Sequence, residues 1–390
     1  MRFNKLIYIR YMPLTAKIFA DFYMDEAIKN GIDVEYWDIT RLFFNNNSDI
    51  EDSSSLISSK KICSYKQLEN LLILESVNPK TLFISIMTFE GRVGKLYRML
   101  TKYKCTLAVF GRNMFPVLSA KNLSIFERLR SINMAKIFNY INTLKVKKQK
   151  LQGVIKKYDI IFMGGELGWQ GVGNIDYNEV SNAEIVKLNS DDYDNFLRLR
   201  NVEPLISGDY ILFLDEYLPL HPDTVLFGIN TVSPEQYYPE LCKYFDKVEK
   251  LYSMPVIIAA HPKALRYKDE DFFEGRKLYF GKSGELSKYA SFVIAHGSTS
   301  INYPIAFEKK LHFITSRNIE KEINTVHKRV ILFANYLRCN YEWFDKNDDR
   351  IDLIEIVSEE CYNSYKYRFQ TWPETENTFS SEIFLNFLKK

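Results

Sequence analysis

The chain has 390 residues, of which 46% are hydrophobic and 15% aromatic, so its composition is that of a folded protein and excludes general disorder. Its formal net charge of +3 is too small for a protein that binds a nucleic-acid backbone, which needs a concentrated basic face. The length exceeds the size at which a single hydrophobic core usually stops growing, and we therefore expect two domains.

The cysteines and the N-terminus indicate a reducing compartment. Five cysteines are widely separated and show no Cys-x-x-Cys spacing, which argues against a disulfide framework and a zinc ribbon. The N-terminus lacks the apolar core of a signal peptide, and no apolar run approaches the roughly 20 residues of a membrane span. We predict a cytoplasmic protein that is not secreted.

The first half of the chain reads as strands that alternate with helices, which predicts a parallel sheet. We expect strands at 6–9, 34–38, 82–86, 106–110 and 159–163, with helices at 19–30 and 65–75. The last strand runs into the glycine-rich stretch 164–173, which matches neither a P-loop nor the dinucleotide fingerprint. This stretch is either a turn with unusual backbone angles or a loop that faces a ligand. Our candidates for acceptor or cleft residues are Arg10, Gly164, Gly165 and Glu166.

Residues 121–157 contain ten Lys or Arg and a single acid, Glu127, interleaved with apolar residues. This pattern is typical of a basic amphipathic helix that contacts an anionic membrane or a phosphorylated lipid acceptor. An ordinary solvated helix has the same pattern, and the sequence leaves both interpretations open.

The second half repeats the strand and helix alternation after a polar stretch at 174–208, where we expect the linker between domains. We therefore predict an N-terminal domain at 1–195, a C-terminal domain at 205–345, and a helical tail at 346–390 that packs across the domain junction. The strands expected in the second domain are 211–214, 256–260, 277–280, 291–295 and 311–314.

Three strands of the second domain each end in a group of mostly polar residues. These residues are Asp215 and Glu216 after 211–214, His261, Pro262 and Lys263 after 256–260, and His296, Gly297, Ser298, Thr299 and Ser300 after 291–295. In an open α/β sheet, ligands bind beyond such carboxyl ends. The spacing therefore indicates a nucleotide-sugar site.

The chemistry of these side chains suits transfer from a phosphate leaving group. A carboxylate after the first strand can take a proton from an attacking hydroxyl, although the same two acids also suit a solvated turn that caps a helix. Pro262 biases His261 toward an extended conformation, which directs its imidazole outward. Hydroxyls and backbone N–H groups of a glycine-containing turn bind phosphate oxygens. This turn begins 36 residues after His261, a separation typical of neighbouring strand ends.

The acidic pair, His261-Pro262 and Ser298-Thr299-Ser300 resemble the acidic, His-Pro and Ser-Ser/Thr motifs of bacterial sialyltransferases and related polysialyl and Kdo transferases. The resemblance implies a GT-B fold of two Rossmann-like domains whose parallel sheets face an interdomain cleft, with the donor nucleotide on the C-terminal domain and the acceptor mainly on the N-terminal one. It also implies Asp215 as general base, His261 as the group that stabilises the departing CMP phosphate, and Ser298 to Ser300 as phosphate ligands. The family's acidic motif often ends in glycine where this chain has Tyr217, so both Asp215 and Glu216 remain candidates for the base.

The sequence thus predicts an inverting glycosyltransferase that moves a nonulosonic acid or Kdo-type sugar from a CMP donor to a cell-surface glycan or lipid-linked glycan. We expect no metal and no other cofactor, because no isolated Asp-x-Asp follows a strand, and the one at 192–194 lies in the polar stretch. We place the protein in the cytoplasm, where 121–157 either contacts the inner membrane peripherally or is an ordinary solvated helix. Three alternatives stay open: a capsule or teichoic-acid phosphotransferase, a UDP-sugar enzyme on the same scaffold, and a non-catalytic glycan-assembly protein.

Overall fold

The computed structural model describes residues 1–44, 56–116, 134–222, 224, 230–346, 351 and 357–390. These residues form two compact units. The first unit holds the described residues of Met1–Met114, Ser124–Asp191 and Arg368–Lys390, and the second holds those of Phe115–Leu123 and Asp192–Tyr367. The tail thus contributes to both units, because the chain enters the first one again at Arg368.

The first unit is built on a parallel sheet that has seven strands within the described residues, in the order β3-β2-β1-β4-β5-β6-β7. The strands are β1 (Lys5–Arg10), β2 (Asp33–Asp38), β3 (Ser58–Lys61), β4 (Thr81–Ser85), β5 (Thr106–Gly111), β6 (Ile160–Gly164) and β7 (Glu184–Leu188). The helices are α1 (Ala16–Asp21), α2 (Met24–Lys29), α3 (Tyr65–Glu75), α4 (Gly94–Lys102), α6 (Met134–Leu151), α7 (Tyr177–Asn182) and α16 (Ser380–Lys389).

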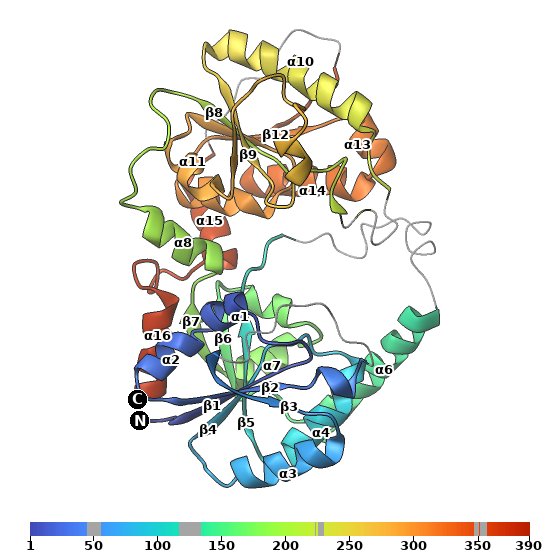
Figure 1. Ribbon diagram of the computed structural model, residues 1–390, viewed down its shortest axis with the longest axis vertical. Helices are drawn as coiled ribbons and strands as arrows, with labels where there is room; N and C mark the ends of the chain where they lie inside the picture. Colours follow the sequence, from blue (N-terminus) through green and yellow to red (C-terminus); the bar gives the residue numbers. More distant parts are fainter. Residues whose placement is uncertain (45–55, 117–133, 223, 225–229, 347–350, 352–356) are drawn as a thin grey trace. The chain divides into compact units, whose positions relative to one another are not determined.

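Alternate side chains of the central strands enter different hydrophobic cores, one on each face of this sheet. On one face, Leu6 and Tyr8 of β1 belong to the core that includes residues of α2 and α16. On the other face, Ile7 and Ile9 belong to the core that includes residues of α3, α4 and α6. The unit is therefore a three-layered α/β structure, and its helices flank the sheet in Figure 1.

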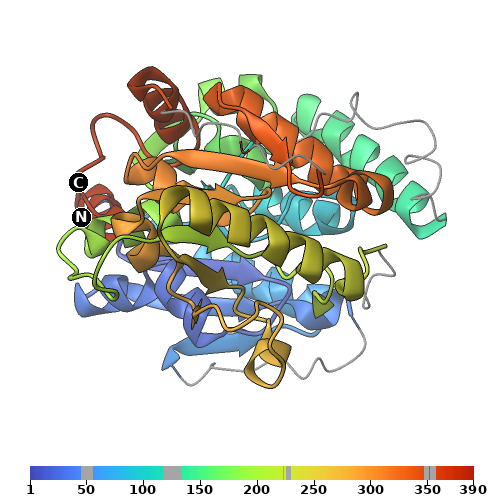
Figure 2. The ribbon, with the colours of Figure 1, turned by 90° about the horizontal axis from the view of Figure 1, so that it is seen from above.

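The second unit has a parallel sheet with six strands in the described part of the chain, in the order β10-β9-β8-β11-β12-β13. Helix α10 packs on one face of this sheet, which Figure 2 shows from the side of the helix. The strands are β8 (Ile211–Leu214), β9 (Val256–Ala260), β10 (Leu278–Phe280), β11 (Phe292–Ala295), β12 (Leu311–Thr315) and β13 (Tyr341–Trp343). The helices are α8 (Asp191–Leu199), α10 (Pro234–Tyr252), α11 (Ser283–Tyr289), α12 (Asn302–Ala306), α13 (Arg317–Glu322), α14 (Asn324–Leu337) and α15 (Glu359–Phe369).

The expected α/β class with parallel sheets is confirmed, and the central strands lie within one residue of their predicted positions. The sequence missed β3, β7 and β13, each of which forms an edge of its sheet. Edge strands are covered less completely than central ones and lack their continuous apolar runs. The stretch 174–208, expected to be a linker, contains α7, β7 and α8, and the boundary between the two units, after Asp191, falls within it.

The helix expected at 19–30 is broken into α1 and α2. Tyr23, between them, has a left-handed backbone with φ of 57°. Tertiary hydrogen bonds hold this break, since the Tyr8 hydroxyl donates to the Phe22 carbonyl at 2.8 Å and Arg112 donates to the Tyr23 hydroxyl at 2.6 Å. Local periodicity carries no information about these distant partners.

The glycine-rich stretch packs against the end of β5. A Cβ on Gly168 would lie 2.2 Å from the carbonyl oxygen of Gly111, so the two backbones approach too closely for any side chain. Gly165 and Gly173 have φ of 73° and 74°, in the region that favours glycine. The expectation of a turn with unusual backbone angles is therefore confirmed.

We expect Gly168→Ala to destabilise the first unit by about 3 kcal/mol, because the new methyl group meets a backbone carbonyl that cannot move cheaply. Gly171→Ala is the matched control. Its Cβ would lie 3.1 Å from the flexible Met114 side chain and 3.3 Å from the Arg112 carbonyl oxygen, a much milder contact than at Gly168, so its loss should stay below about 1 kcal/mol. Urea unfolding of both variants measures the difference, and equal losses would contradict this account.

Candidate functional site

A cavity of about 610 Å³ opens at the carboxyl ends of β8, β9 and β11 in the second unit. The strand order reverses between β8 and β11, which is the point where open α/β sheets bind their ligands. The residues that line the cavity include Glu216, His221, His261, Ser298, Thr299 and Arg329.

The sheet order differs from the sequence interpretation in one respect. The strands that end at His261 and at the serine turn are not neighbours, because β8 lies between them. Glu216, which follows β8, is therefore flanked by both groups. Sequence separation did not reveal this order, since the chain reaches β8 before either of its neighbours.

Glu216 faces the cavity and connects two strand ends. One carboxylate oxygen accepts the backbone N–H of Gly297 at 2.6 Å, and the other lies 3.8 Å from an Arg329 guanidinium nitrogen. Burial raises the pKa of Glu216, while Arg329 opposes that shift. This carboxylate is consequently more basic than an exposed one.

Asp215 is buried beneath the cavity surface and is not among the residues that line it. Its carboxylate accepts backbone N–H groups from Tyr217 at 3.0 Å and from His261 at 3.3 Å, and the hydroxyl of Tyr267 at 3.3 Å. Burial raises the pKa of Asp215 to about 6, although these three hydrogen bonds act in the opposite direction. Asp215 therefore holds the backbone around His261.

His261 lines the cavity with a defined orientation. Its Nδ1 accepts the backbone N–H of Lys263 at 3.2 Å, which in the neutral imidazole assigns the proton to Nε2. The His221 ring lies 4.9 Å away, centroid to centroid. The imidazole can therefore donate a hydrogen bond through Nε2. Pro262 also lines the cavity, whereas Lys263 is exposed and contributes its backbone.

The serine turn supplies hydroxyl groups to the same cavity, which Ser298, Thr299 and Ser300 all line. The Ser298 hydroxyl accepts the backbone N–H of Ser300 at 3.2 Å and so fixes the shape of the turn. A Cβ on Gly297 would lie 2.8 Å from Cδ of Arg329, so the absence of a side chain lets the arginine pack over this residue.

His296 lies in the core of the second unit and does not line the cavity. Its Nδ1 hydrogen-bonds the Ile314 carbonyl at 2.7 Å and its Nε2 the Tyr237 hydroxyl at 2.9 Å. Burial lowers the pKa of His296 to about 4, so it is neutral near pH 7. The structure therefore gives this expected donor-binding residue a packing role.

Sequence reasoning overlooked Arg329 and His221. Arg329 comes from α14, and a single arginine in an amphipathic helix carries no local sign of a ligand site. His221 lies in the loop between Pro219 and Pro222 and does not directly follow a strand. Only the packing of α14 and of this loop beside the strand ends brings the two side chains to the cavity.

The expected acceptor residues lie in the first unit. Arg10 ends β1, and Gly164 ends β6. Gly164 and Gly165 allow neighbouring backbone segments to pack closely, since a Cβ on Gly165 would lie 2.8 Å from the Arg368 carbonyl oxygen. Glu166 is exposed. A second cavity opens at the ends of β4 and β5, and its lining includes Gly171 and Val172 of the glycine-rich stretch but none of the four expected residues.

No three His, Cys, Asp or Glu side chains form a potential metal-binding group within the described residues. Independence from metals and cofactors stays a prediction.

No protein-family model and no curated protein matches this chain. Its structure is similar to a variant of the wall teichoic acid polymerase TagF, with 10% identity, coverage of 99% of this chain and 89% of that chain, and a TM-score of 0.50. UDP-GlcNAc 2-epimerase from Methanocaldococcus jannaschii has 12% identity, coverage of 99% of both chains and a TM-score of 0.45. The calicheamicin glycosyltransferase CalG4 has 10% identity, coverage of 100% and 98%, and a TM-score of 0.46. Likeness at such identity concerns the fold alone, and the chain has the two-domain α/β fold of the GT-B type.

Proposed function

We propose that the protein is an inverting, metal-independent glycosyltransferase that moves a nonulosonic acid or Kdo-type sugar from a CMP donor to a surface glycan. The observation that carries this proposal is the cavity at the β8/β11 switch point, where a carboxylate, an imidazole, an arginine and a hydroxyl-rich turn converge. In the reaction, an acceptor hydroxyl attacks the anomeric carbon, the bond to the CMP phosphate breaks, and a base takes the hydroxyl proton.

The leaving phosphate gains negative charge in this step, and three groups are suited to stabilise it. His261 donates through Nε2, the Ser298–Ser300 hydroxyls donate from the turn, and Arg329 supplies a positive charge. Such donors stabilise a transition state most when they are already oriented before the reaction. A leaving group with one phosphate needs no divalent ion beside these donors.

Of the two acids, we propose Glu216 as the base and Asp215 as a positioning residue. Glu216 faces the cavity and its pKa is raised by burial, which favours proton uptake. The hydrogen bond from His261 N–H to Asp215 instead fixes the strand end that presents the imidazole. This assignment exchanges the order of the two acids that the resemblance implied.

The resemblance of the His-Pro and serine motifs supports CMP as the donor nucleotide. A CDP-glycerol phosphotransferase is the principal alternative, since the wall teichoic acid polymerase shares the fold. Both alternatives use the same cavity, and the nucleotide that binds there distinguishes them.

We expect CMP at a concentration of about 100 times its Kd to raise the Tm by several degrees without divalent metal, because a ligand of the native state alone adds about 2.7 kcal/mol of stability. UDP and CDP-glycerol should give smaller shifts. Thermal unfolding with each nucleotide measures this. Preference for UDP would indicate a UDP-sugar enzyme, preference for CDP-glycerol a phosphotransferase, and no shift with any nucleotide would contradict the proposal.

The same thermal-unfolding measurements, with the same nucleotides, apply to proteins with substitutions in the cavity. His261→Ala and Arg329→Ala should both lose most of the CMP shift. Arg338→Ala is the matched control, because Arg338 lies at the end of the same helix with its side chain 72% exposed and is not among the cavity residues. An equal loss in all three variants would indicate a general effect on stability.

We expect Glu216→Gln to lower kcat by roughly 10²- to 10⁴-fold while the CMP shift is retained, because removal of a general base affects the chemical step. Asp215→Asn should lower kcat by less than about tenfold. Steady-state kinetics with a CMP-sugar donor measure both effects. The reverse order would make Asp215 the base.

Asp215→Asn has a second, independent signature in stability. The carboxyl pKa of about 6 in the folded protein exceeds its value of about 3.9 in an unfolded chain, so the folded state binds the proton more tightly. The resulting stabilisation is complete below about pH 4 and falls by about 3 kcal/mol as the pH rises through 6. Urea unfolding of Asp215→Asn should lack this slope, whereas exposed Asp269→Asn should keep it.

We further propose that α6 brings the enzyme to an anionic membrane that carries its acceptor. Val146 and Lys150 face the first unit, where Lys150 pairs with Glu179 at 2.6 Å. The opposite side of the helix exposes Tyr140, Ile141, Leu144 and Leu151 together with Lys145, Lys147 and Lys148. Apolar residues flanked by lysines, with no acid in the helix, suit an anionic lipid surface. No helix in the described ranges is long and apolar enough to cross a bilayer.

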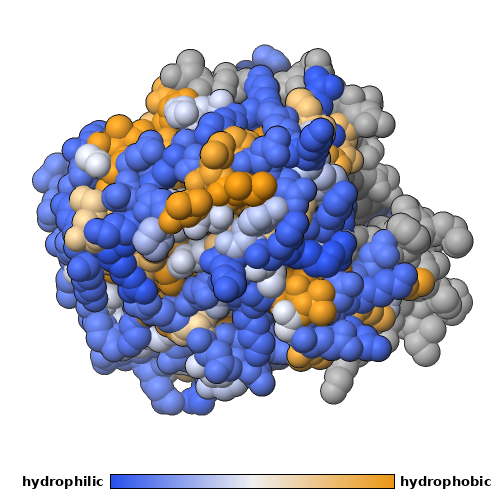
Figure 3. Space-filling model, turned by 90° about the horizontal axis from the view of Figure 1, so that it is seen from below, coloured by the Kyte–Doolittle hydropathy of each residue, from blue (hydrophilic) through white to orange (hydrophobic). Residues whose placement is uncertain are grey.

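We expect the protein to float with vesicles that contain phosphatidylglycerol and to dissociate at high salt, with Leu144→Glu and Leu151→Glu reducing the bound fraction severalfold. Leu74→Glu is the control, since Leu74 is 70% exposed on α3. Figure 3 shows the face of the first unit that includes α3, where hydrophobic patches are scattered within a hydrophilic surface. Equal binding to neutral vesicles, or equal loss in Leu74→Glu, would contradict a specific role of α6.

A further inference from the structure

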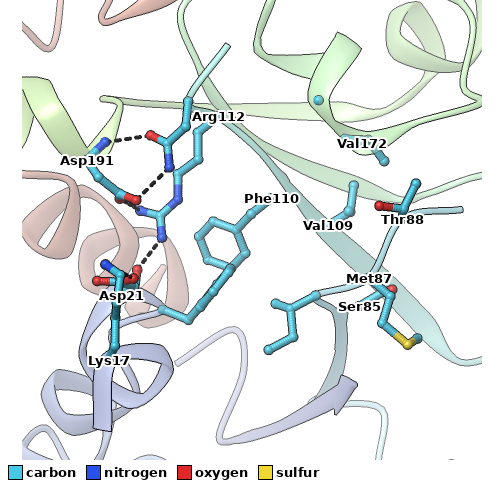
Figure 4. Close-up of a pocket in the computed structure, with 14 residues that line it drawn as sticks. Lys17, Asp21, Ser85, Met87, Thr88, Val109, Phe110, Arg112, Val172 and Asp191 are labelled. Carbon is cyan, nitrogen blue, oxygen red and sulfur yellow. Dashed lines mark hydrogen bonds and ion pairs between the residues drawn. The ribbon is translucent and has the colours of Figure 1, made fainter. Parts of the chain in front are cut away.

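The second cavity, of about 460 Å³, lies entirely within the first unit, at the carboxyl ends of β4 and β5. Figure 4 shows that its lining is divided. Lys17, Asp21, Arg112 and Asp191 lie at one end, and Ser85, Met87, Thr88, Val109 and Val172 at the other, with Phe110 between the two groups. The volume is that of a small-molecule site.

The charged end is already balanced within the protein. Lys17 pairs with Asp21 at 2.8 Å, and Arg112 pairs with Asp191 at 2.8 Å, so these four side chains sum to zero charge. Arg112 also donates to the Tyr23 hydroxyl and to the Asp21 carbonyl, and its side chain is only 5% exposed. A phosphate would therefore meet two carboxylates and a guanidinium whose donors are engaged, which disfavours an anionic ligand.

The same end suits hydroxyl groups. The carboxylates of Asp21 and Asp191 remain 25% and 37% exposed, and a carboxylate oxygen can accept more hydrogen bonds than its present ion pair uses. Asn113 donates to Asp191 at 2.6 Å and also lines the cavity. Ligand hydroxyls can thus hydrogen-bond here without displacing a charge.

The other end offers an apolar surface beside a hydroxyl. Phe110 is half-buried and is held in place by Phe162, at 4.8 Å between ring centroids, and by Phe22, at 5.0 Å. Met87 and Val109 continue the apolar surface, and Thr88 is exposed at the rim. A flat ligand with an apolar face can pack against this wall.

We propose that this cavity binds an uncharged sugar ring, with its hydroxyls on Asp21 and Asp191 and its apolar face against Phe110. This proposal rests on the proposed function. The acceptor is then a glycan, and the sugar bound in this cavity is a neutral hexose or N-acetylhexosamine. The two carboxylates disfavour a phosphorylated or carboxylated residue at this position. The residues that carry the recognition are therefore other than Arg10 and Gly164–Glu166.

The test is direct binding of simple sugars to the full chain without any donor. Methyl glycosides of glucose, galactose, N-acetylglucosamine and N-acetylgalactosamine are titrated by saturation-transfer NMR, with glucose 6-phosphate as the anionic probe. We expect at least one neutral glycoside to bind with a Kd on the order of millimolar, since a single ring makes few contacts, and glucose 6-phosphate to bind at least tenfold more weakly.

Two variants locate the binding. Thr88→Trp fills the cavity from an exposed position and should abolish it, and Asp191→Asn should weaken it roughly tenfold. Asn70→Trp, on the exposed side of α3, is the control for an added surface tryptophan and should bind as the wild type does. Unchanged binding in Thr88→Trp, preference for glucose 6-phosphate, or no binding of any glycoside would overturn the proposal.

The CMP thermal shift of the same proteins separates this inference from the proposed function. Sugar binding that Thr88→Trp abolishes, in a protein that no nucleotide stabilises, would support the sugar site and refute the transferase. A normal CMP shift without sugar binding would refute the sugar site and leave the donor site standing.

Discussion

All strands in each sheet run parallel, and this constraint decides where chemistry can occur in the described residues. Because parallel strands end at one edge of a sheet, groups that are distant in the sequence meet there. In the second unit, the edge brings Glu216, His261 and the serine turn to one cavity. In the first unit, it brings the ends of β4 and β5 to another. Each unit thus has a cavity of ligand size at the carboxyl ends of its parallel strands.

The two cavities differ in how charge is compensated. In the second unit, one arginine faces one buried carboxylate at 3.8 Å, so the charges are coupled loosely and a phosphate can approach Arg329. In the first unit, Arg112 and Asp191 form a close pair at 2.8 Å beside a second pair. A loosely compensated cation favours an anionic ligand, whereas a closed network of pairs favours a neutral one. This contrast is what the proposed reaction, between an activated sugar phosphate and a neutral glycan, requires.

The burial of two adjacent acids connects stability with the proposed activity. Burial raises the pKa of both Asp215 and Glu216. Each carboxylate also accepts a hydrogen bond from a backbone N–H group at a neighbouring strand end. Charged forms of such groups are costly, and the cost is offset by the hydrogen bonds that orient the strand ends. Carboxyl groups with a pKa raised in this way are common where side chains are arranged for proton transfer.

The sequence by itself determined the α/β class, the positions of the central strands and the groups that follow them, because buried parallel strands appear as continuous apolar runs with polar ends. For this reason it predicted that Glu216, His261 and Ser298 lie together, and all three line one cavity. Tertiary structure alone decided which acid faces the cavity, since adjacent side chains of a chain leaving a strand point in different directions. Tertiary structure alone also places Arg329 at the first cavity and forms the second cavity around Phe110. Contacts between separate helices and strand ends produce no periodic pattern in the sequence that could predict them.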